Sequence, residues 1–483
     1  MADEGELQAA NERVTALETA LAESQADLAE AHELIATLRK QLAELAERVA
    51  QNSRNSHLPP SSDGPGAGKR LGGRKGTKSG RKRGGQKGRK GAKRELVDVS
   101  KVDEVVDLFP EACQGCAADL PKHLCHEPRR HQQVDIIDYG PWTTEWRRHA
   151  VKCPHCGTVT VADYDPKKIP SSAFGPRLTA IVVMLTGVYH ISRLRVVQLI
   201  FDLYGISISV GTVSAMEGRS SESLADVHDE VKRVVEHAAV KHTDGTTWLR
   251  DGKTKSLWTI SSSLATLYEI LENGARETIS PLFGALIGIL VSDRASVFGF
   301  WVMVMRQICW AHLLRKFVSF SERDGPAGKV GRELLECTAL VFDYWRGFKG
   351  GQLDRAELAA WMRPVQQHFE SVLERAVAAN IERVSGSCAN ILAHGDALWT
   401  FVAHEGVDPT NNDAERALRP LVLWRKRSFG SKSDRGERFV ARVMTAAYTA
   451  RKQGKSILDF FEKALTAKLE GRPAPRLVEP AIA

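Results

Sequence analysis

Apolar side chains recur every seven residues along the first 50 positions, and a second apolar position follows three residues after each. The first set is Leu7, Val14, Leu21, Leu28, Ile35, Leu42 and Val49. The second set is Ala10, Leu17, Ala31, Leu38 and Leu45, with Ser24 as its polar member. A seam sustained over about six heptads is typical of a coiled coil. We therefore predict that residues 1–50 form an oligomerisation helix, with a long helix packed on its own chain as the alternative.

Residues 166–235 show the spacing of amphipathic helices. One apolar stripe consists of Leu178, Ile181, Val182, Leu185 and Val188. A second helix is expected over 192–203, with Gly205 as its stop, and a third is expected after Ser207 or Ser209. A helix, a glycine turn and a short helix are compatible with helix-turn-helix recognition of DNA. Simple packing of these helices is the alternative.

The order of elements across residues 236–452 is the strongest indication of a fold. Predicted strands lie at 238–242, 256–262, 264–271, 285–291 and 302–308, with a short helix at 275–279. Asp244 follows the first strand and Asp293 follows the fourth. This order matches a ribonuclease-H-like α/β core, in which the first and fourth strands are neighbours. The two aspartates are therefore expected to share one site.

The segment between the last predicted strand and Glu415 is too long for a minimal core of this kind. Helical patterns lie at 332–345, 355–369 and 369–384. They predict an α-helical insertion across about 313–405. Another helix is expected at 436–453, and a last one begins with a capping box at Ser456, within a C-terminal segment of residues 453–483.

The composition is that of a water-soluble globular protein: of 483 residues, 43% are hydrophobic and 26% are charged. No uncharged apolar run reaches the roughly 18 residues that a membrane span needs. The first ten residues hold three acids and no base, unlike a secretory signal. Eight cysteines in so long a chain do not make a disulfide scaffold. Membrane proteins, small secreted domains and wholly disordered chains are therefore excluded.

The net charge of +8 is unevenly distributed. Residues 1–50 hold eleven acids and four bases, whereas residues 64–94 hold thirteen bases and no acid. A tract rich in Gly, Lys, Arg and Ser cannot bury enough apolar surface to fold, so residues 51–95 are expected to be a disordered basic linker. Its cations suit the phosphate backbone of DNA, and a solubilising linker is the alternative. The cations at its centre are Arg81, Lys82 and Arg83.

Two Cys-x-x-Cys pairs, separated by 36 residues, lie within residues 96–165. The four cysteines are Cys113, Cys116, Cys153 and Cys156. Four thiolates give the closed tetrahedral site of structural zinc, and two disulfides are the alternative. Segments 133–138 and 143–151, between the pairs, are expected to be strands. The prediction is a zinc-ribbon-like module that holds Zn²⁺ for stability and does no chemistry itself.

A third carboxylate is needed on a helix beside the two aspartates. Residues 410–412 offer Thr and Asn side chains that can cap a helix carrying Glu415 in its first turns. Hard oxygen ligands hold Mg²⁺ (or Mn²⁺), and two such ions stabilise both the attacking and the leaving oxygen of a phosphodiester. We therefore predict that Asp244, Asp293 and Glu415 form a catalytic magnesium site.

The helix that carries Glu415 also carries cations. Arg416 and Arg419, three residues apart, share one helix face and are expected to hold phosphates. Other basic side chains extend this surface toward the C-terminus. Those predicted to bind DNA are Arg425, Lys426, Arg427 and Lys432.

The sequence TNNDAERALRPLVLWRKRSFGS at 410–431 resembles the C-terminal signature of the transposases of insertion-sequence family sixty-six. CWAHLLRKF at 309–317 is similar to that family's Cys-x-x-His-x-x-Arg-Lys-Phe block, and the order of domains corresponds over nearly the full chain. The resemblance implies an acidic-triad, DDE-type transposase. Its catalytic residues would be Asp244, Asp293 and Glu415.

Two stretches differ from the pattern that is usual in that family. Asp244 is followed by Gly-Thr where Asp-Glu-Thr is common, and Asp293 is followed by Arg-Ala where Asp-Gly-Tyr is usual. His312 lies in the matching block and is expected to orient DNA or to assist proton transfer. A hydrogen-bonded histidine that positions the start of a helix is the alternative.

The expected function is that of a bacterial DNA transposase, cytoplasmic and associated with the nucleoid. Water would cleave the phosphodiester at the end of the element, and the freed 3′-hydroxyl would attack target DNA. The expected partners are double-stranded DNA of the element ends and the target, further copies of the chain in a dimer or higher oligomer, and small companion proteins. A DNA-binding regulator or inactivated transposase that retains the zinc module and basic tail, and a metal-dependent nuclease, are the alternatives.

Overall fold

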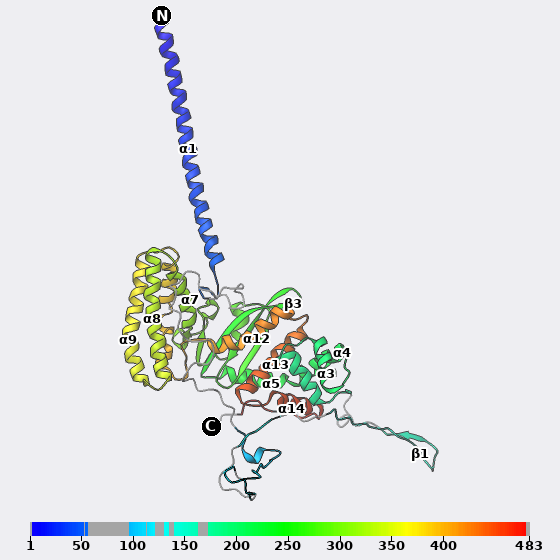
Figure 1. Ribbon diagram of the computed structural model, residues 1–483. Helices are drawn as coiled ribbons and strands as arrows, with labels where there is room; N and C mark the ends of the chain where they lie inside the picture. Colours follow the sequence, from blue (N-terminus) through cyan, green and yellow to red (C-terminus); the bar gives the residue numbers. More distant parts are fainter. Residues whose placement is uncertain are drawn as a thin grey trace. The chain divides into compact units, whose positions relative to one another are not determined.

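The structure is a computed structural model that describes residues 2–52, 54–56, 96–112, 114–120, 130–134, 140–162 and 172–479 (Figure 1). The chain divides into two units, of which one holds residues 1–67 and 145–483 and the other holds residues 68–144. Among the described residues, no helix is both long enough and apolar enough to cross a lipid bilayer.

The N-terminal helix α1 spans Ala2–Ala50 without a break, as the heptad pattern predicts. The large apolar seam residues from Val14 to Val49 are exposed, from 45% for Ile35 to 80% for Val49. A helix that presents a continuous apolar seam to water is stabilised when another surface covers the seam. The helix is confirmed, and the coiled coil stays a prediction.

Helical elements precede the sheet. They are α2 at Pro176–Val183, a π-helical turn at Met184–Val188, α3 at Arg193–Tyr204, α4 at Val210–Ser223 and α5 at Ala225–Glu236. Ser192 caps α3 through its side chain, and Gly205 ends that helix at φ +64°, as predicted. Ser209, one of the two expected caps, begins α4.

In the described core, five strands form one sheet in the order β5-β4-β3-β6-β7. The strands are β3 at Val240–Arg250, β4 at Lys253–Ser261, β5 at Thr266–Leu271, β6 at Ile289–Ser292 and β7 at Arg306–Ile308. The first three pair antiparallel, whereas β6 runs parallel to both β3 and β7. A short helix, α6 at Arg276–Ile279, follows β5. The prediction that the first and fourth strands are neighbours is confirmed.

Three of the five strands differ most from those predicted. The first strand does not end before Asp244 but continues to Arg250, because its outer half pairs with β4 across a tight hairpin. The fourth strand begins only at Ile289, since Leu286 and Gly288 before it adopt positive φ, which a strand excludes. The expected strand at 302–308 is reduced to β7, because a 3-10 turn takes up Met303–Met305.

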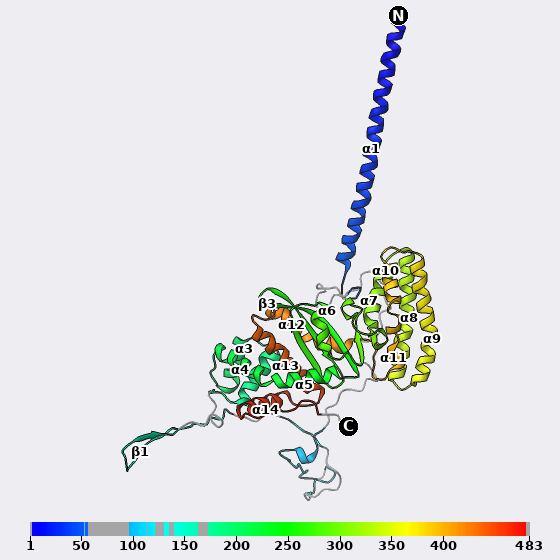
Figure 2. The same ribbon diagram turned by 180° about the vertical axis from the view of Figure 1, so that it is seen from behind.

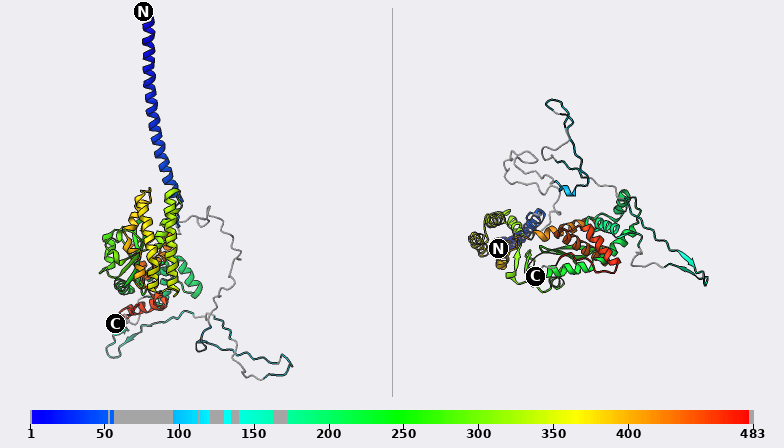
Figure 3. Two further views of the ribbon diagram at one scale, coloured as in Figure 1. Left: turned by 90° about the vertical axis from the view of Figure 1, so that its left-hand side faces the viewer. Right: turned by 90° about the horizontal axis from the view of Figure 1, so that it is seen from below.

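A helical region follows β7. It comprises α7 at Trp310–Ser321, α8 at Gly325–Lys349, α9 at Arg355–Ala378, α10 at Ser385–Leu392 and α11 at Thr400–Ala403. Figure 3 shows α8 and α9 side by side, in green-yellow and yellow. The helices predicted at 355–369 and 369–384 form the single helix α9, which begins with a capping box at Asp354 and ends at Ala378.

The chain then returns to the sheet with α12 at Asn412–Ser428, α13 at Asp434–Lys452 and α14 at Ile457–Leu469. One hydrophobic core joins β3, β4 and β5 to α5, α13 and α14. A second core joins β6 and β7 to α7, α8, α9 and α10, on the other side of the view in Figure 2. The strand β6 contributes to both cores, because Leu290 lies in the first core whereas Ile289 and Val291 lie in the second.

Candidate active site

Asp244 lies near the middle of β3, on the face of that strand that packs against α12. Side chains alternate along a strand, so Asp244, Thr246 and Trp248 share one face. Thr246 Oγ1 accepts a hydrogen bond from Arg425 of α12 at 3.2 Å, and Trp248 Nε1 donates to Ser431, just beyond α12, at 3.1 Å. The Asp244 carboxylate therefore faces α12.

Asp293 lies at the carboxyl end of β6, beside β3. His242 pairs with Val291, so extending this parallel register by two residues brings Asp244 level with Asp293. The Asp293 carboxylate accepts a hydrogen bond from the Ala295 N–H at 2.9 Å. The buried Arg306 of β7 donates to the main-chain oxygen of Asp293 at 3.1 Å and so holds the end of β6 in place.

Glu415 lies in the first turn of α12, as predicted. Asn411, one of the predicted caps, does not cap the helix with its side chain. Its Nδ2 instead donates to the main-chain oxygen of Thr243 at 2.7 Å, and its N–H donates to Cys309 Sγ at 3.1 Å. The buried Asn411 therefore fastens the start of α12 to the residue that precedes Asp244.

Two side chains of α7 reach Glu415. His312 Nδ1 lies 3.5 Å from Glu415 Oε1, and Arg315 Nη2 lies 3.3 Å from the same oxygen. The two residues are three positions apart, so they share a face of the helix. The position of His312 thus fits a role in orienting Glu415. Arg315 received no role in the prediction, although its spacing from His312 in the matching block offered a signal.

Two of the three acids, Asp244 and Glu415, have raised pKa values. Burial, followed by the charges of Glu415 and Asp293, raises the pKa of Asp244 to about 7. Burial also raises the pKa of Glu415, while Arg315 opposes that shift. Carboxylates that repel one another in a partly buried site are the arrangement that a divalent cation relieves. The donor set of hard oxygens therefore fits Mg²⁺ or Mn²⁺.

One other group of ligand atoms lies nearby. Among the described residues, Cys309, His312 and Glu415 have ligand atoms within 4.8 Å of one another. Burial raises the pKa of the Cys309 thiol to about 11, so this sulfur remains protonated at neutral pH. Cys309 accepts from the Asn411 N–H, and it is fully buried. We therefore assign Cys309 to the anchoring of α12 rather than to metal binding.

The family model for the Transposase IS66 family matches residues 171–438, a span that contains all three acids together with His312 and Arg315. The chain belongs to this family. The family predicted from the two sequence motifs is thereby confirmed. Residues 6–95 match a second family, described as a family of unknown function (DUF6444).

Two proteins of Sinorhizobium fredii (strain NBRC 101917 / NGR234) are similar to this IS66-family protein. The uncharacterized protein y4hP is 24% identical over 426 residues, which cover 78% of this chain and 74% of that protein. The uncharacterized protein y4qI is 27% identical over 178 residues, which cover 35% of this chain and 32% of that protein. Neither name states an activity.

The structure explains why glycine follows Asp244 in this IS66-family protein. Gly245 lies directly opposite Trp258 of β4 in the antiparallel register. A Cβ atom at position 245 would lie 2.8 Å from the indole of Trp258, which is closer than packed atoms approach. The buried Trp258 therefore occupies the space that a glutamate at position 245 would need.

The predicted DNA-binding cations of α12 fall into two groups. Arg416, at 76% exposure of its side chain, and the exposed Arg419 point into solvent. Lys426, Arg427 and Lys432 are exposed as well. Arg425 is different, because its guanidinium donates to Thr246 and Thr247 of β3. Its placement indicates that it holds α12 against the sheet.

The second cysteine pair lies in a small hairpin. Strands β1 at Ala150–Lys152 and β2 at Val159–Val161 pair around Cys153 and Cys156. The Gly157 N–H donates to the Cys153 oxygen at 2.9 Å, which forms a tight turn. Hydrogen bonding by Thr158 lowers the pKa of Cys156 to about 7, which favours the thiolate that metals bind.

Other parts of the predicted zinc module differ or stay untested. Residues 143–149 are not in a strand. The strand β1 pairs with β2, which follows Cys156, and not with a strand between Cys116 and Cys153. Most of the predicted strand at 133–138 lies outside the described residues, as do Cys113, Arg81, Lys82 and Arg83. Cys116 is exposed and unpaired by any disulfide. The four-cysteine site stays a prediction.

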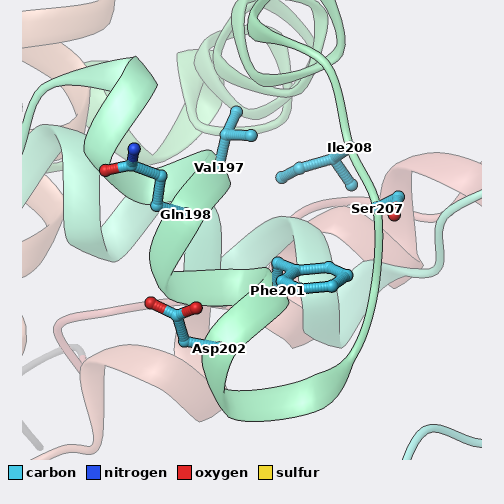
Figure 4. A pocket seen from close by; sticks show the side chains of 6 residues that line it. All are labelled: Val197, Gln198, Phe201, Asp202, Ser207 and Ile208. Atoms are coloured by element: carbon cyan, nitrogen blue, oxygen red, sulfur yellow. The ribbon is translucent and has the colours of Figure 1, made fainter.

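A pocket of about 510 Å³ lies between α3 and the loop that leads to α4 (Figure 4). It is lined by Val197, Gln198, Phe201, Asp202, Ser207 and Ile208. It contains none of the predicted catalytic residues. The neighbouring helix α4 packs against α2, α13 and α14, and its single base, Arg219, donates to Ser172. The contacts of α4 therefore favour the packing role over direct recognition of DNA.

Proposed function

We propose that the protein is the DNA transposase of an insertion sequence, which binds the ends of its element and catalyses metal-dependent cleavage and strand transfer. The observation that carries this proposal is the convergence of Asp244, Asp293 and Glu415 from β3, β6 and α12, where burial and the charges of the other two acids raise the pKa of Asp244. Membership in the transposase family supplies the class of reaction.

The topology supports a ribonuclease-H-like core. Three antiparallel strands are followed by two parallel ones, and the first and fourth strands are neighbours that each carry an aspartate. The helices α7 to α11 stand between β7 and α12 as an insertion. The third acid therefore comes from the first helix after this insertion, which then packs on β3 and β4.

In this mechanism Asp244, Asp293 and Glu415 would hold Mg²⁺ or Mn²⁺ by their carboxylate oxygens. When bound, such a cation stabilises negative charge on the oxygens of the phosphodiester during displacement. Arg315 and His312 restrict the orientation of Glu415, and Asn411 fixes the helix that carries it. No Ser or Tyr nucleophile is required, since water and then the freed 3′-hydroxyl are the attacking groups.

The remaining predicted regions supply DNA binding and pairing. The exposed cations of α12 and of the following turn would hold phosphates near the acids, and the linker cations Arg81, Lys82 and Arg83 would add affinity that does not depend on sequence. The seam of α1 would pair protomers so that two element ends are held together. Cys113, Cys116, Cys153 and Cys156 would bind structural Zn²⁺, and small companion proteins would assist the assembly.

The central experiment measures cleavage of a DNA duplex that ends in the terminal repeat of the element. Asp244→Asn, Asp293→Asn and Glu415→Gln should each reduce Mg²⁺-dependent cleavage by at least about 10³-fold, because each removes a charged ligand. Binding of the duplex in a mobility-shift assay should change little. Glu405→Gln, an exposed acid near the start of α12, is the matched control and should cleave normally.

The outcomes separate the proposal from its alternatives. A wild-type protein that shifts the duplex without cutting it would be a regulator or an inactivated transposase. A protein that cuts the duplex but yields no joined products with a plasmid target would be a nuclease. Normal cleavage by all three acid variants would refute the catalytic assignment.

A further inference from the structure

A bulky aromatic side chain stands in solvent at the end of α12. Phe429, the residue that follows this helix, is 74% exposed and adopts φ +59°. The left-handed region is uncommon for a bulky residue, and exposure of a phenyl ring gives up its hydrophobic stabilisation. Packing within the fold therefore does not explain the exposed ring, whereas a function would.

The turn that carries Phe429 is fixed by the sheet. Gly430, at φ +86°, lies so close to β3 that a Cβ atom there would be 2.1 Å from the Leu249 oxygen. The Ser431 N–H donates to that same oxygen at 2.9 Å, and the Asp251 N–H donates back to Ser431 at 3.0 Å. The ring thus projects from a turn that backbone hydrogen bonds hold on both sides, rather than from a loose loop.

The surroundings of Phe429 are cationic. Lys426 and Arg427 precede it, and Lys432, with a side chain 84% exposed, follows it and pairs with the exposed Asp251 at 3.5 Å. A phenyl ring among exposed cations is poorly suited to an apolar protein partner, because the cations would have to lose their hydration. It is well suited to DNA, since phosphates pair with the cations while an apolar side chain enters between bases.

Two independent lengths place Phe429 relative to the acids. Phe429 lies 14 positions after Glu415, which at a helical rise of about 1.5 Å per position is about 21 Å. Along β3, Arg250 lies six positions after Asp244, which at about 3.3 Å per position is about 20 Å. Because α12 runs alongside β3 (Figure 2), the length from Glu415 to Phe429 along the helix and the length from Asp244 to Arg250 along the strand both estimate the distance from the acids to Phe429. Duplex DNA rises about 3.4 Å per base pair, so this separation corresponds to about six base pairs.

We propose that Phe429 is a wedge that inserts into the stack of the end duplex about six base pairs from the scissile phosphate. The proposal rests on the proposed function and adds a positioning residue to it. The ring would unstack one base step, while Arg427 and Lys432 hold the phosphates around it. Insertion at a fixed distance would set the position of the duplex relative to Asp244, Asp293 and Glu415.

The test uses 2-aminopurine, a base whose fluorescence rises when it is unstacked. Duplexes of the terminal repeat carry it at single positions from three to nine base pairs from the cleavage site. They are mixed with the full-length Asp244→Asn protein, which is expected to bind without cutting. Fluorescence should rise by severalfold at a position near six and stay low at the flanking positions.

Variants of Phe429 supply the second measurement. Phe429→Ala should abolish the fluorescence rise in the Asp244→Asn background and, with Asp244 intact, should slow cleavage about tenfold or more. Phe429→Trp should retain both signals. Leu423→Ala, which shortens another exposed apolar residue of α12 at 42% exposure, is the control and should behave as the wild type.

The two proposals fail in different ways. If Phe429→Ala keeps both the fluorescence rise and the cleavage rate, the wedge is refuted and the transposase function stands. If the wild type gives a rise that depends on Phe429 but never cleaves, the wedge stands and the catalytic proposal is refuted.

Discussion

Asp244 is the residue at which the chemistry of the site affects the stability of the fold. Its raised pKa, about 7 against an ordinary value of 3.8, means that the folded protein binds the Asp244 proton more tightly than the unfolded chain does. Stability is therefore lost as the pH rises from about 4 to about 7, and the loss remains at higher pH. Burial, together with the charges of Glu415 and Asp293, thus disfavours the ionised form of Asp244 in the folded protein.

Asp244→Asn should remove this cost of ionisation. At pH 8 the free energy of unfolding of the variant should exceed that of the wild type by up to about 4 kcal/mol, so the variant should unfold at a higher temperature. At pH 4 the two proteins should unfold at nearly the same temperature. Added Mg²⁺ should raise the midpoint of the wild type more than that of the variant, since the wild type keeps the complete ligand set. Thermal unfolding across this pH range, with and without Mg²⁺, makes the measurement.

Glu405→Gln again serves as the control, because an exposed acid outside the site should show no such pH-dependent difference. Parallel pH curves for the wild type and Asp244→Asn would contradict the assigned pKa. The Gly245 N–H can still donate to an asparagine oxygen, so the substitution preserves that hydrogen bond.

The element that completes the site is α12, and its attachment depends on one amide. Asn411→Ala should lower the free energy of unfolding by about 1–3 kcal/mol, because the Thr243 oxygen loses its buried donor. It should lower the cleavage rate further than the stability loss explains, since Glu415 would no longer be held beside Asp244. Asn412→Ala, at the exposed neighbouring position, should leave both quantities near wild-type values.

Chemical unfolding and a cleavage assay at a temperature where both variants are folded would separate the two effects. If Asn411→Ala loses stability but cleaves at the wild-type rate, the amide has no role in positioning Glu415.

The sequence predicted the ends of those elements that are set by residues adjacent in the chain. Ser192 and Gly205 bound α3 as expected, because a cap and a left-handed glycine act within one turn. Strand ends were less predictable, since pairing decides them. The first strand continues through Asp244 because β4 lies opposite, and no pattern within the strand itself announces that partner.

In the candidate site, too, some features could be predicted from the sequence and others depend on the fold. The acids Asp244, Asp293 and Glu415 were predictable because strand order and family motifs both indicate them. The contact between Arg315 and Glu415 joins residues 100 positions apart, and only the folded helical region sets that distance. Arg425 was predicted to bind DNA, but the fold turns its guanidinium onto β3, which no local pattern foretells.

At the scale of the whole molecule, α1 carries the prediction about assembly. Leu21→Lys together with Leu28→Lys places two charges in the apolar seam, so the oligomer should dissociate. Ala22→Lys with Ala29→Lys adds the same charges one position away, outside the seam, and should leave the oligomer intact. Sedimentation of the full-length protein at several concentrations makes the comparison.

An unchanged mass for the Leu21 and Leu28 variant would refute the coiled coil. It would favour the alternative in which α1 packs on its own chain. The acids lie in a part of the chain separate from α1. The core should therefore unfold at the same midpoint in the Leu21 and Leu28 variant as in the Ala22 and Ala29 variant.

The bond between Asn411 and Thr243 joins positions 168 residues apart, with the whole helical region made in between. At a synthesis rate of about 5–20 residues per second, roughly 8–34 s separate the emergence of these two residues from the ribosome. During that interval β3 carries its aspartate while the third carboxylate does not yet exist. A partly translated copy therefore lacks the complete set of acids that the proposed cleavage of DNA needs.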